Sequence, residues 1–177
     1  MRHTGMCNTA YYNVHWNQDG QLTYTGSAPS EYTTSIVGNR TVQFIHGAAT
    51  AATTKPFLVV AATRAPHGPE TPAPWYANAL PEVRNRITPA WNFSARNGDH
   101  VPWVADLPPI SPGAANDQDN AFRNRWRSLL SVDDLVAGVV EALEQRGLLN
   151  TTYVLHTSGA RLQHTCCIFD GRGSDLL

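Results

Sequence analysis

The chain has 177 residues, of which 42% are hydrophobic and 15% are charged, and its formal net charge at pH 7 is −1. This composition favours a packed domain and excludes a charge-rich disordered segment. A net charge so close to zero lacks the basic excess typical of proteins that bind nucleic acid or anionic membrane surfaces, so we expect neither partner.

Targeting and cysteine patterns add two negative expectations. No apolar run approaches the roughly 18 residues of a membrane span, and residues 1–6 lack the apolar stretch of a secretory signal peptide. The three cysteines, Cys7, Cys166 and Cys167, have the spacing of neither a disulfide framework nor a zinc site. We expect them to be incidental thiols.

A hairpin and a helix are the first predicted elements. Alternating apolar residues over 11–25 flank Asp19-Gly20, a dipeptide typical of tight hairpin turns. A helix of about 12 residues follows, with Thr34 or Ser35 as its expected N-cap. Its apolar face is formed by Ile36, Val37, Val42, Phe44 and Ile45.

Two short apolar runs, 57–62 and 152–156, have the length and continuity of strands buried on both faces. Between them, residues 64–119 hold ten of the twelve prolines, and their tryptophans predict an ordered loop packed on the fold. A long helix is expected from near Asn120 to Gly147, which takes the C-cap role. This order of elements predicts an α/β fold with a mainly parallel sheet.

Ligands of such sheets lie beyond the carboxyl ends of the strands, and His67 follows the first predicted strand. Pro66 and Pro69 stiffen the backbone around it, so the imidazole is expected to have little conformational freedom. Such a histidine could donate to an anion or act as a general acid. The alternative is a loop histidine that is hydrogen-bonded to backbone.

The run Lys55-Pro56-Phe57-Leu58-Val59-Val60, followed by Ala65-Pro66-His67-Gly68-Pro69, resembles the sulfatases. It looks most like the branch of N-acetylglucosamine-6-sulfatases and green-algal arylsulfatases. The resemblance continues through 120–136 and 148–155 and covers residues 11–158. It implies part of an alkaline-phosphatase-like α/β sandwich.

The resemblance also implies a chemistry and a site. Sulfatases hydrolyse sulfate esters with a formylglycine made from the cysteine of a Cys-x-Pro-Ser-Arg motif, and their calcium ion is held by Asp and Asn oxygens. His67 matches the family's sulfate-contacting histidine. The implied substrate of the parent family is a sulfated sugar of the N-acetylglucosamine-6-sulfate type or an aryl sulfate.

The sequence departs from the family at the catalytic positions. Cys7-Asn8-Thr9-Ala10 does not match the formylglycine motif, and Gly159-Ala160 stand where the family has its calcium-binding Asp-Asn. Asp133-Asp134 lie in the predicted long helix, where solvation or helix pairing is the expected role. We therefore predict no catalytic residue, no metal ligand and no bound calcium in this chain, and no hydrolysis by the chain alone.

We divide the chain into a partial sulfatase catalytic domain, residues 1–158, and a divergent tail, residues 159–177. A frame slip near Gly159 and a divergent loop are the two alternatives for the tail. The frame slip is suggested by Arg161-Leu162-Gln163, because assumed codons for these residues read one base later give Gly-Tyr-Asn, close to the family's continuation.

Three acceptor patterns for N-glycosylation begin at Asn39, Asn92 and Asn150. They fit the secretory location, extracellular or lysosomal, that the family resemblance implies. Two other kinds of function stay open beside the enzyme fragment. One is a non-catalytic truncated product, and the other is a secreted carbohydrate-binding module that stacks sugars on Trp75, Trp91 and Trp103.

Overall fold

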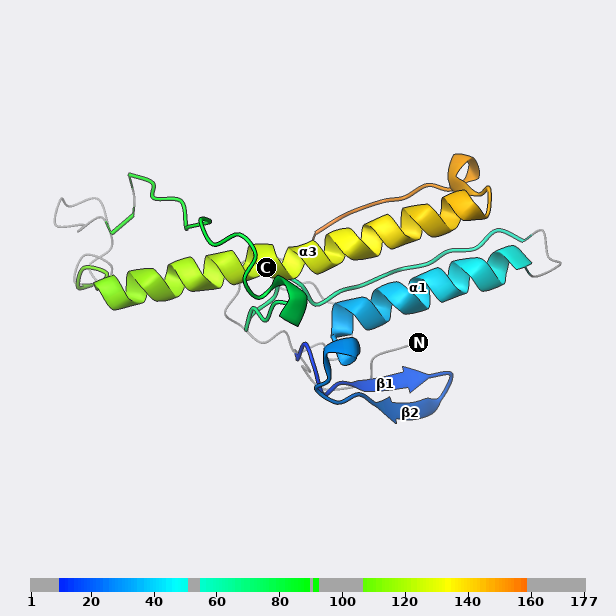
Figure 1. The fold of residues 1–177 in the computed structure, drawn as a ribbon, viewed down its shortest axis with the longest axis horizontal. Helices are drawn as coiled ribbons and strands as arrows, with labels where there is room; N and C mark the ends of the chain where they lie inside the picture. The colour runs from blue at the N-terminus through cyan, green and yellow to red at the C-terminus, as the bar shows by residue number, and fades with distance from the viewer. Residues whose placement is uncertain (1–9, 51–54, 90, 93–106, 159–177) are drawn as a thin grey trace, which may run out of the picture.

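The computed structural model describes residues 10–50, 55–89, 91–92 and 107–158. Two long helices run side by side in the same direction, and a small antiparallel hairpin lies near the start of the first helix (Figure 1). The helices and strands are β1 (His15–Gln18), β2 (Gln21–Tyr24), α1 (Thr33–Thr50) and α3 (Pro112–Gln145), with 3-10 helices η1 (Pro29–Glu31), η2 (Pro74–Tyr76) and η3 (Leu149–Thr151).

The predicted hairpin is confirmed. Asp19 and Gly20 connect β1 and β2 with positive φ angles of 53° and 89°, the conformation of a two-residue type I′ turn. The Asn17 Oδ1 atom accepts a hydrogen bond of 2.8 Å from the amide of Gly20. Trp16 pairs with Thr23 across the sheet.

Helix α1 has 18 residues rather than about 12, and the predicted N-caps are wrong, because Thr34 and Ser35 lie inside the helix. The carbonyl of Tyr32 accepts the first helical bond from the amide of Ile36 at 3.0 Å, so Tyr32 holds the N-cap position. The start is set by a tertiary contact: the amide and hydroxyl of Thr33 donate to the Tyr11 carbonyl at 3.0 and 2.6 Å.

Helix α3 begins at Pro112, ahead of the predicted start near Asn120. Ser111 caps it by accepting a 3.2 Å hydrogen bond from the Ala114 amide, and proline is favoured at the first helical position. The predicted C-cap is confirmed, since Gly147 has a φ of 67°. The amide of Leu148 donates to the carbonyl of Leu143 at 2.8 Å, which completes a Schellman motif.

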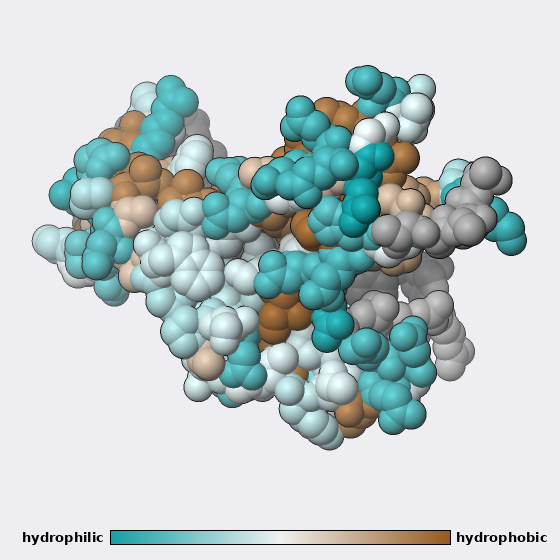
Figure 2. Space-filling model, turned by 45° about the vertical axis from the view of Figure 1, so that its right-hand side comes forward, coloured by the Kyte–Doolittle hydropathy of each residue, from teal (hydrophilic) through white to brown (hydrophobic). Residues whose placement is uncertain are grey.

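Two small clusters form the core. In the first, Ile45 of α1 packs against Ala142 and Leu143 of α3, and Phe57 lies against this cluster. The second consists of Tyr11, Tyr32 and Ala73, which join the segment before the hairpin to the proline-rich segment. Apolar residues also reach the surface in separate patches (Figure 2). Within the described residues, no helix combines the length and apolar character that a membrane crossing requires.

The two predicted buried strands are wrong for the described structure. Segments 57–62 and 152–156 form no strand, and the hairpin is the only sheet among the described residues. The first segment runs beside α1 and the second beside α3 (Figure 1). Leu58 is 86% exposed and Leu155 is 90% exposed. Apolar sequence alone does not make a strand, because the backbone also needs a neighbour with which to pair.

Candidate functional site

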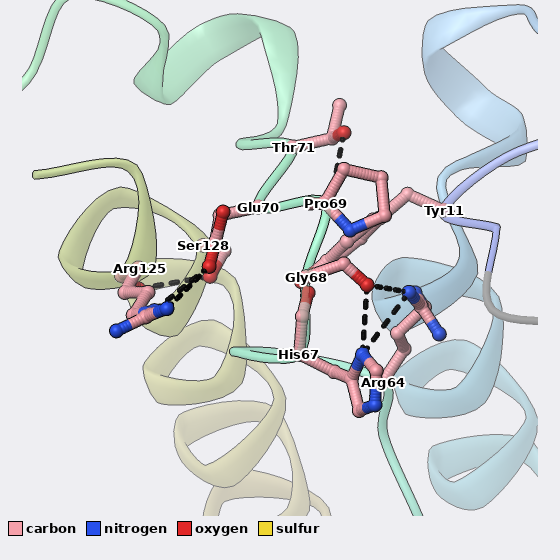
Figure 3. Close-up of polar contacts among 9 residues, drawn as sticks. All are labelled: Tyr11, Arg64, His67, Gly68, Pro69, Glu70, Thr71, Arg125 and Ser128. Carbon is pink, nitrogen blue, oxygen red and sulfur yellow. Dashed lines mark hydrogen bonds and ion pairs between the residues drawn. The ribbon is translucent and has the colours of Figure 1, made fainter. Parts of the chain in front are cut away.

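The proline-rich turn around His67 follows the extended segment 57–62. One hydrogen bond closes the turn, and a second attaches it to Tyr11. The His67 amide donates to the carbonyl of Arg64 at 2.9 Å, which closes the turn. The Tyr11 hydroxyl donates to the carbonyl of His67 at 2.8 Å. Figure 3 shows this turn between the helices, with the imidazole of His67 beside Arg64 and Gly68.

The His67 ring is exposed, and its Nδ1 atom lies 2.7 Å from the carbonyl oxygen of Gly68. A carbonyl oxygen only accepts, so Nδ1 carries a hydrogen and Nε2 is left for other contacts. The Nη2 atom of Arg64 lies 3.3 Å from Nδ1 and also donates to the Gly68 carbonyl. Because Nδ1 and Nη2 are both donors here, the two meet at a shared acceptor and do not bond to each other.

A hollow of about 280 Å³ lies where β1, the start of α1 and the turn meet. Its apolar side comes from residues of the hairpin and of α1, including Val14, Trp16 and Val37. Arg64 and His67 are the two ionisable residues among those that line it. The described structure therefore places His67 at the edge of a hollow whose charged groups are both basic.

Arg64 is not among the site residues predicted from the sequence, because no motif distinguishes it from the other arginines. Its guanidinium carbon lies 5.3 Å from the centre of the Tyr11 ring, a cation–π distance. Burial lowers the pKa of Arg64, while nearby Tyr11 and Glu70 act in the opposite direction. Arg64 Nε is buried and has no hydrogen-bond partner among the described residues.

An ion pair fixes the other end of the turn to α3. The Nε and Nη2 atoms of Arg125 lie 2.8 and 2.7 Å from the Glu70 Oε1 atom, and the side chain of Glu70 is only 14% exposed (Figure 3). Two further arginines of α3, Arg123 and Arg127, donate to the backbone carbonyls of Val83 and Ala79. The polar face of α3 thus holds the proline-rich segment.

The acidic pair of α3 divides into two roles. Asp133 is exposed, as expected for a solvated residue. Asp134 is also exposed, but it accepts hydrogen bonds of 2.8 and 3.0 Å from the Tyr76 hydroxyl, and so helps to hold η2. Solvation and helix pairing alone therefore do not describe Asp134.

The described residues do not fit a calcium site. No three His, Cys, Asp or Glu side chains converge in the part of the chain that the structure describes. Thr157 and Ser158 are exposed at the end of the second extended segment, and Gly159-Ala160 lie outside the described residues. The sequence also contains no Cys-x-Pro-Ser-Arg motif.

Of the three predicted sugar-stacking residues, the structure describes Trp75 and Trp91. Trp75 is 51% exposed and makes an edge contact with Tyr32, with ring centres 6.1 Å apart. Trp91 is partly buried, and Trp103 lies outside the described residues. Trp75 is thus part of an aromatic group that packs η2 against the start of α1.

The three predicted glycosylation residues have different surroundings. Asn39 is exposed within α1, and Asn150 is exposed in η3. The Oδ1 atom of Asn92 accepts a 2.6 Å hydrogen bond from the amide of Ile110.

The chain is similar in sequence to proteins of one known enzyme family. The sulfatase family model matches residues 3–161, and the chain therefore belongs to the sulfatase family. This confirms the resemblance that the motifs around His67 indicate.

Several individual sulfatases are similar to the chain. The chain is 36% identical to N-acetylglucosamine-6-sulfatase of Homo sapiens over 157 residues, and 32% identical to a putative extracellular sulfatase Sulf-1 homolog of Caenorhabditis elegans over 162 residues. These alignments cover 85% and 88% of this chain but only 27% and 22% of the relatives. Arylsulfatase of Volvox carteri is 28% identical, over 73% of this chain and 23% of its own length. The chain thus spans about a quarter of these relatives, and no solved structure matches it.

Proposed function

We propose that this chain is the sulfate-contacting segment of a sulfate ester hydrolase, and that it does not hydrolyse the ester by itself. The observation that carries the proposal is the fixed imidazole of His67 at the edge of a hollow whose charged lining is basic. His67 is also the residue that matches the sulfate-contacting histidine of the family.

The hydrogen bond at Nδ1 determines how His67 acts. Since Nδ1 donates to the Gly68 carbonyl, the neutral ring presents Nε2 as an acceptor, which does not bind a sulfate oxygen. The imidazolium form presents an N–H at Nε2, and such a charge-assisted donor suits an anion. The Gly68 carbonyl orients the ring and the Tyr11 hydroxyl holds the backbone carbonyl of His67 before the sulfate arrives, so little reorganisation is needed.

The proposed lack of turnover follows from the missing nucleophile. Nucleophilic catalysis and a Lewis-acid metal each supply several kcal/mol of barrier reduction. A single histidine that binds sulfate replaces neither. The hydroxyl groups that line the hollow belong to Thr33 and Thr63, and the Thr33 hydroxyl already donates to the Tyr11 carbonyl at 2.6 Å.

The two extended apolar segments support a place within a larger sheet. We propose that residues 1–158 are part of an alkaline-phosphatase-like domain, in which 57–62 and 152–156 take the role of parallel strands once neighbours are present. Among the described residues, neither segment has a strand partner, and Val60 is 81% exposed. Residues 159–177 are, on this proposal, a divergent tail.

Substrate and location are proposed from the relatives. A sulfated sugar of the N-acetylglucosamine-6-sulfate type and an aryl sulfate both present the sulfate that His67 would bind. Two of the relatives are named as extracellular sulfatase homologs, and this supports a secretory location for this chain.

The test is calorimetric titration of the full purified chain with sodium sulfate, followed by an assay with 4-nitrophenyl sulfate and calcium. We expect sulfate binding that His67→Gln removes and that His156→Gln, a change at an exposed histidine outside the hollow, leaves unchanged. We expect no release of nitrophenol. Calcium-dependent turnover would overturn the proposed inactivity, and binding that survives His67→Gln would overturn the role of His67.

A further inference from the structure

Arg64 is a partly buried cation whose hydrogen-bonding capacity is largely unused. A guanidinium has five N–H donors, yet among the described residues only Nη2 of Arg64 has a hydrogen-bond partner, the Gly68 carbonyl. Its Nε atom is buried without a partner. Buried polar atoms are nearly always satisfied in folded proteins, so an unsatisfied donor of this kind commonly marks the place of a water or an ion.

The position of Arg64 is fixed by its neighbours. The face of the Tyr11 ring supports the guanidinium at 5.3 Å, and the Gly68 carbonyl holds Nη2. The same carbonyl holds the Nδ1 atom of His67. The guanidinium and the imidazole are therefore held next to each other by one acceptor (Figure 3). Both residues line the hollow.

Acidic groups do not compete for Arg64 within the hollow. The other lining residues are apolar or carry hydroxyl groups. Glu70, the acidic residue of the same turn, is paired instead with Arg125 of α3 at 2.7 Å. A guanidinium with free donors beside a second basic side chain attracts an anion, and its planar fork suits the oxygens of a tetrahedral oxyanion.

We infer that Arg64 is a second anion-binding residue, which holds a tetrahedral oxyanion in this hollow together with His67. In the proposed function the oxyanion is the sulfate of the substrate, and the inference rests on that function for the identity of the ligand. Arg64 supplies a fixed positive charge, whereas Nε2 of His67 donates to the oxyanion only in the imidazolium form.

The experiment is titration of the full chain with sodium sulfate, comparing Arg64→Gln and Arg64→Lys with the unchanged chain. Loss of a charge-assisted hydrogen bond predicts that Arg64→Gln weakens sulfate binding by about tenfold or more. Arg64→Lys keeps the charge and is expected to bind better than Arg64→Gln. Arg40→Gln, at an exposed position of α1 outside the hollow, is the matched control and should bind normally.

Circular dichroism and thermal unfolding of each variant show whether it keeps the fold. If folded Arg64→Gln binds sulfate as well as the unchanged chain while His67→Gln does not, the inference is wrong and the proposed function stands. If Arg64→Gln weakens binding and His67→Gln does not, the inference stands and the proposed role of His67 is wrong. If the unchanged chain binds no sulfate, both are overturned.

Discussion

The Tyr11 hydroxyl donates a 2.8 Å hydrogen bond to the backbone carbonyl of His67, across 56 positions of sequence. The same tyrosine stacks on Tyr32, with ring centres 5.6 Å apart, and supports the Arg64 guanidinium. One side chain thus connects the segment before the hairpin, the start of α1 and the candidate site.

Removing only the Tyr11 hydroxyl should weaken the support of the His67 turn and leave the packing of the core unchanged. Tyr11→Phe keeps the ring and loses the hydrogen bond, so we expect the free energy of unfolding to fall by about 1 kcal/mol. Sulfate binding should weaken as well, because His67 loses one of its supports. Urea unfolding measures the first effect and calorimetric titration the second; unchanged stability would show that water replaces the bond.

Alkaline pH should destabilise the fold. Burial raises the pKa of Tyr11 and of Tyr32 in the folded state. A group whose pKa is raised by folding contributes stability that is complete below its unfolded pKa, about 10 for tyrosine, and that is lost as pH rises toward the folded value. We expect the urea midpoint to be constant near neutrality and to fall above about pH 10. Tyr32→Phe should flatten this fall, and an equal fall in that variant would contradict the assignment.

The Glu70–Arg125 ion pair should matter more than an exposed one. Glu70 is only 14% exposed, so Glu70→Gln leaves Arg125 in a partly desolvated position without its partner. We expect a loss of about 1–2 kcal/mol, between the values for surface pairs and for fully buried pairs. The control is Arg84→Gln, which breaks a pair whose arginine is 67% exposed and should cost almost nothing. Equal losses in the two variants would refute the distinction.

Two glycines of α1 should respond in opposite ways to alanine. A Cβ atom at Gly47 would meet open space, so Gly47→Ala should stabilise the protein by about 0.5–1 kcal/mol through helix propensity. A Cβ atom at Gly38 would lie 3.2 Å from Cγ of Leu135 on α3. Gly38→Ala should therefore push the helices apart and cost about 1 kcal/mol. Thermal unfolding of both variants measures the difference, and a stabilised Gly38→Ala would show that α3 gives way.

Local sequence was enough for the elements whose determinants are near in the chain. Asp19-Gly20 predicted the hairpin because few residues adopt positive φ at two successive positions. Gly147 predicted the end of α3 for the same reason. The motif around His67 indicated the family, which the match over residues 3–161 confirms.

Tertiary contacts decided the rest. The first turn of α1 depends on the Tyr11 carbonyl, which no local pattern around Thr33 reveals. The apolar run 57–62 reads as a buried strand, yet it pairs with no described strand, since pairing depends on distant backbone. No sequence pattern distinguishes Arg64 either, and only the fold brings its unpaired Nε–H group and His67 to the same hollow. The sequence by itself thus determined the family and the short-range turns. Long-range packing determined that Arg64 lies beside His67 and that Glu70 pairs with Arg125.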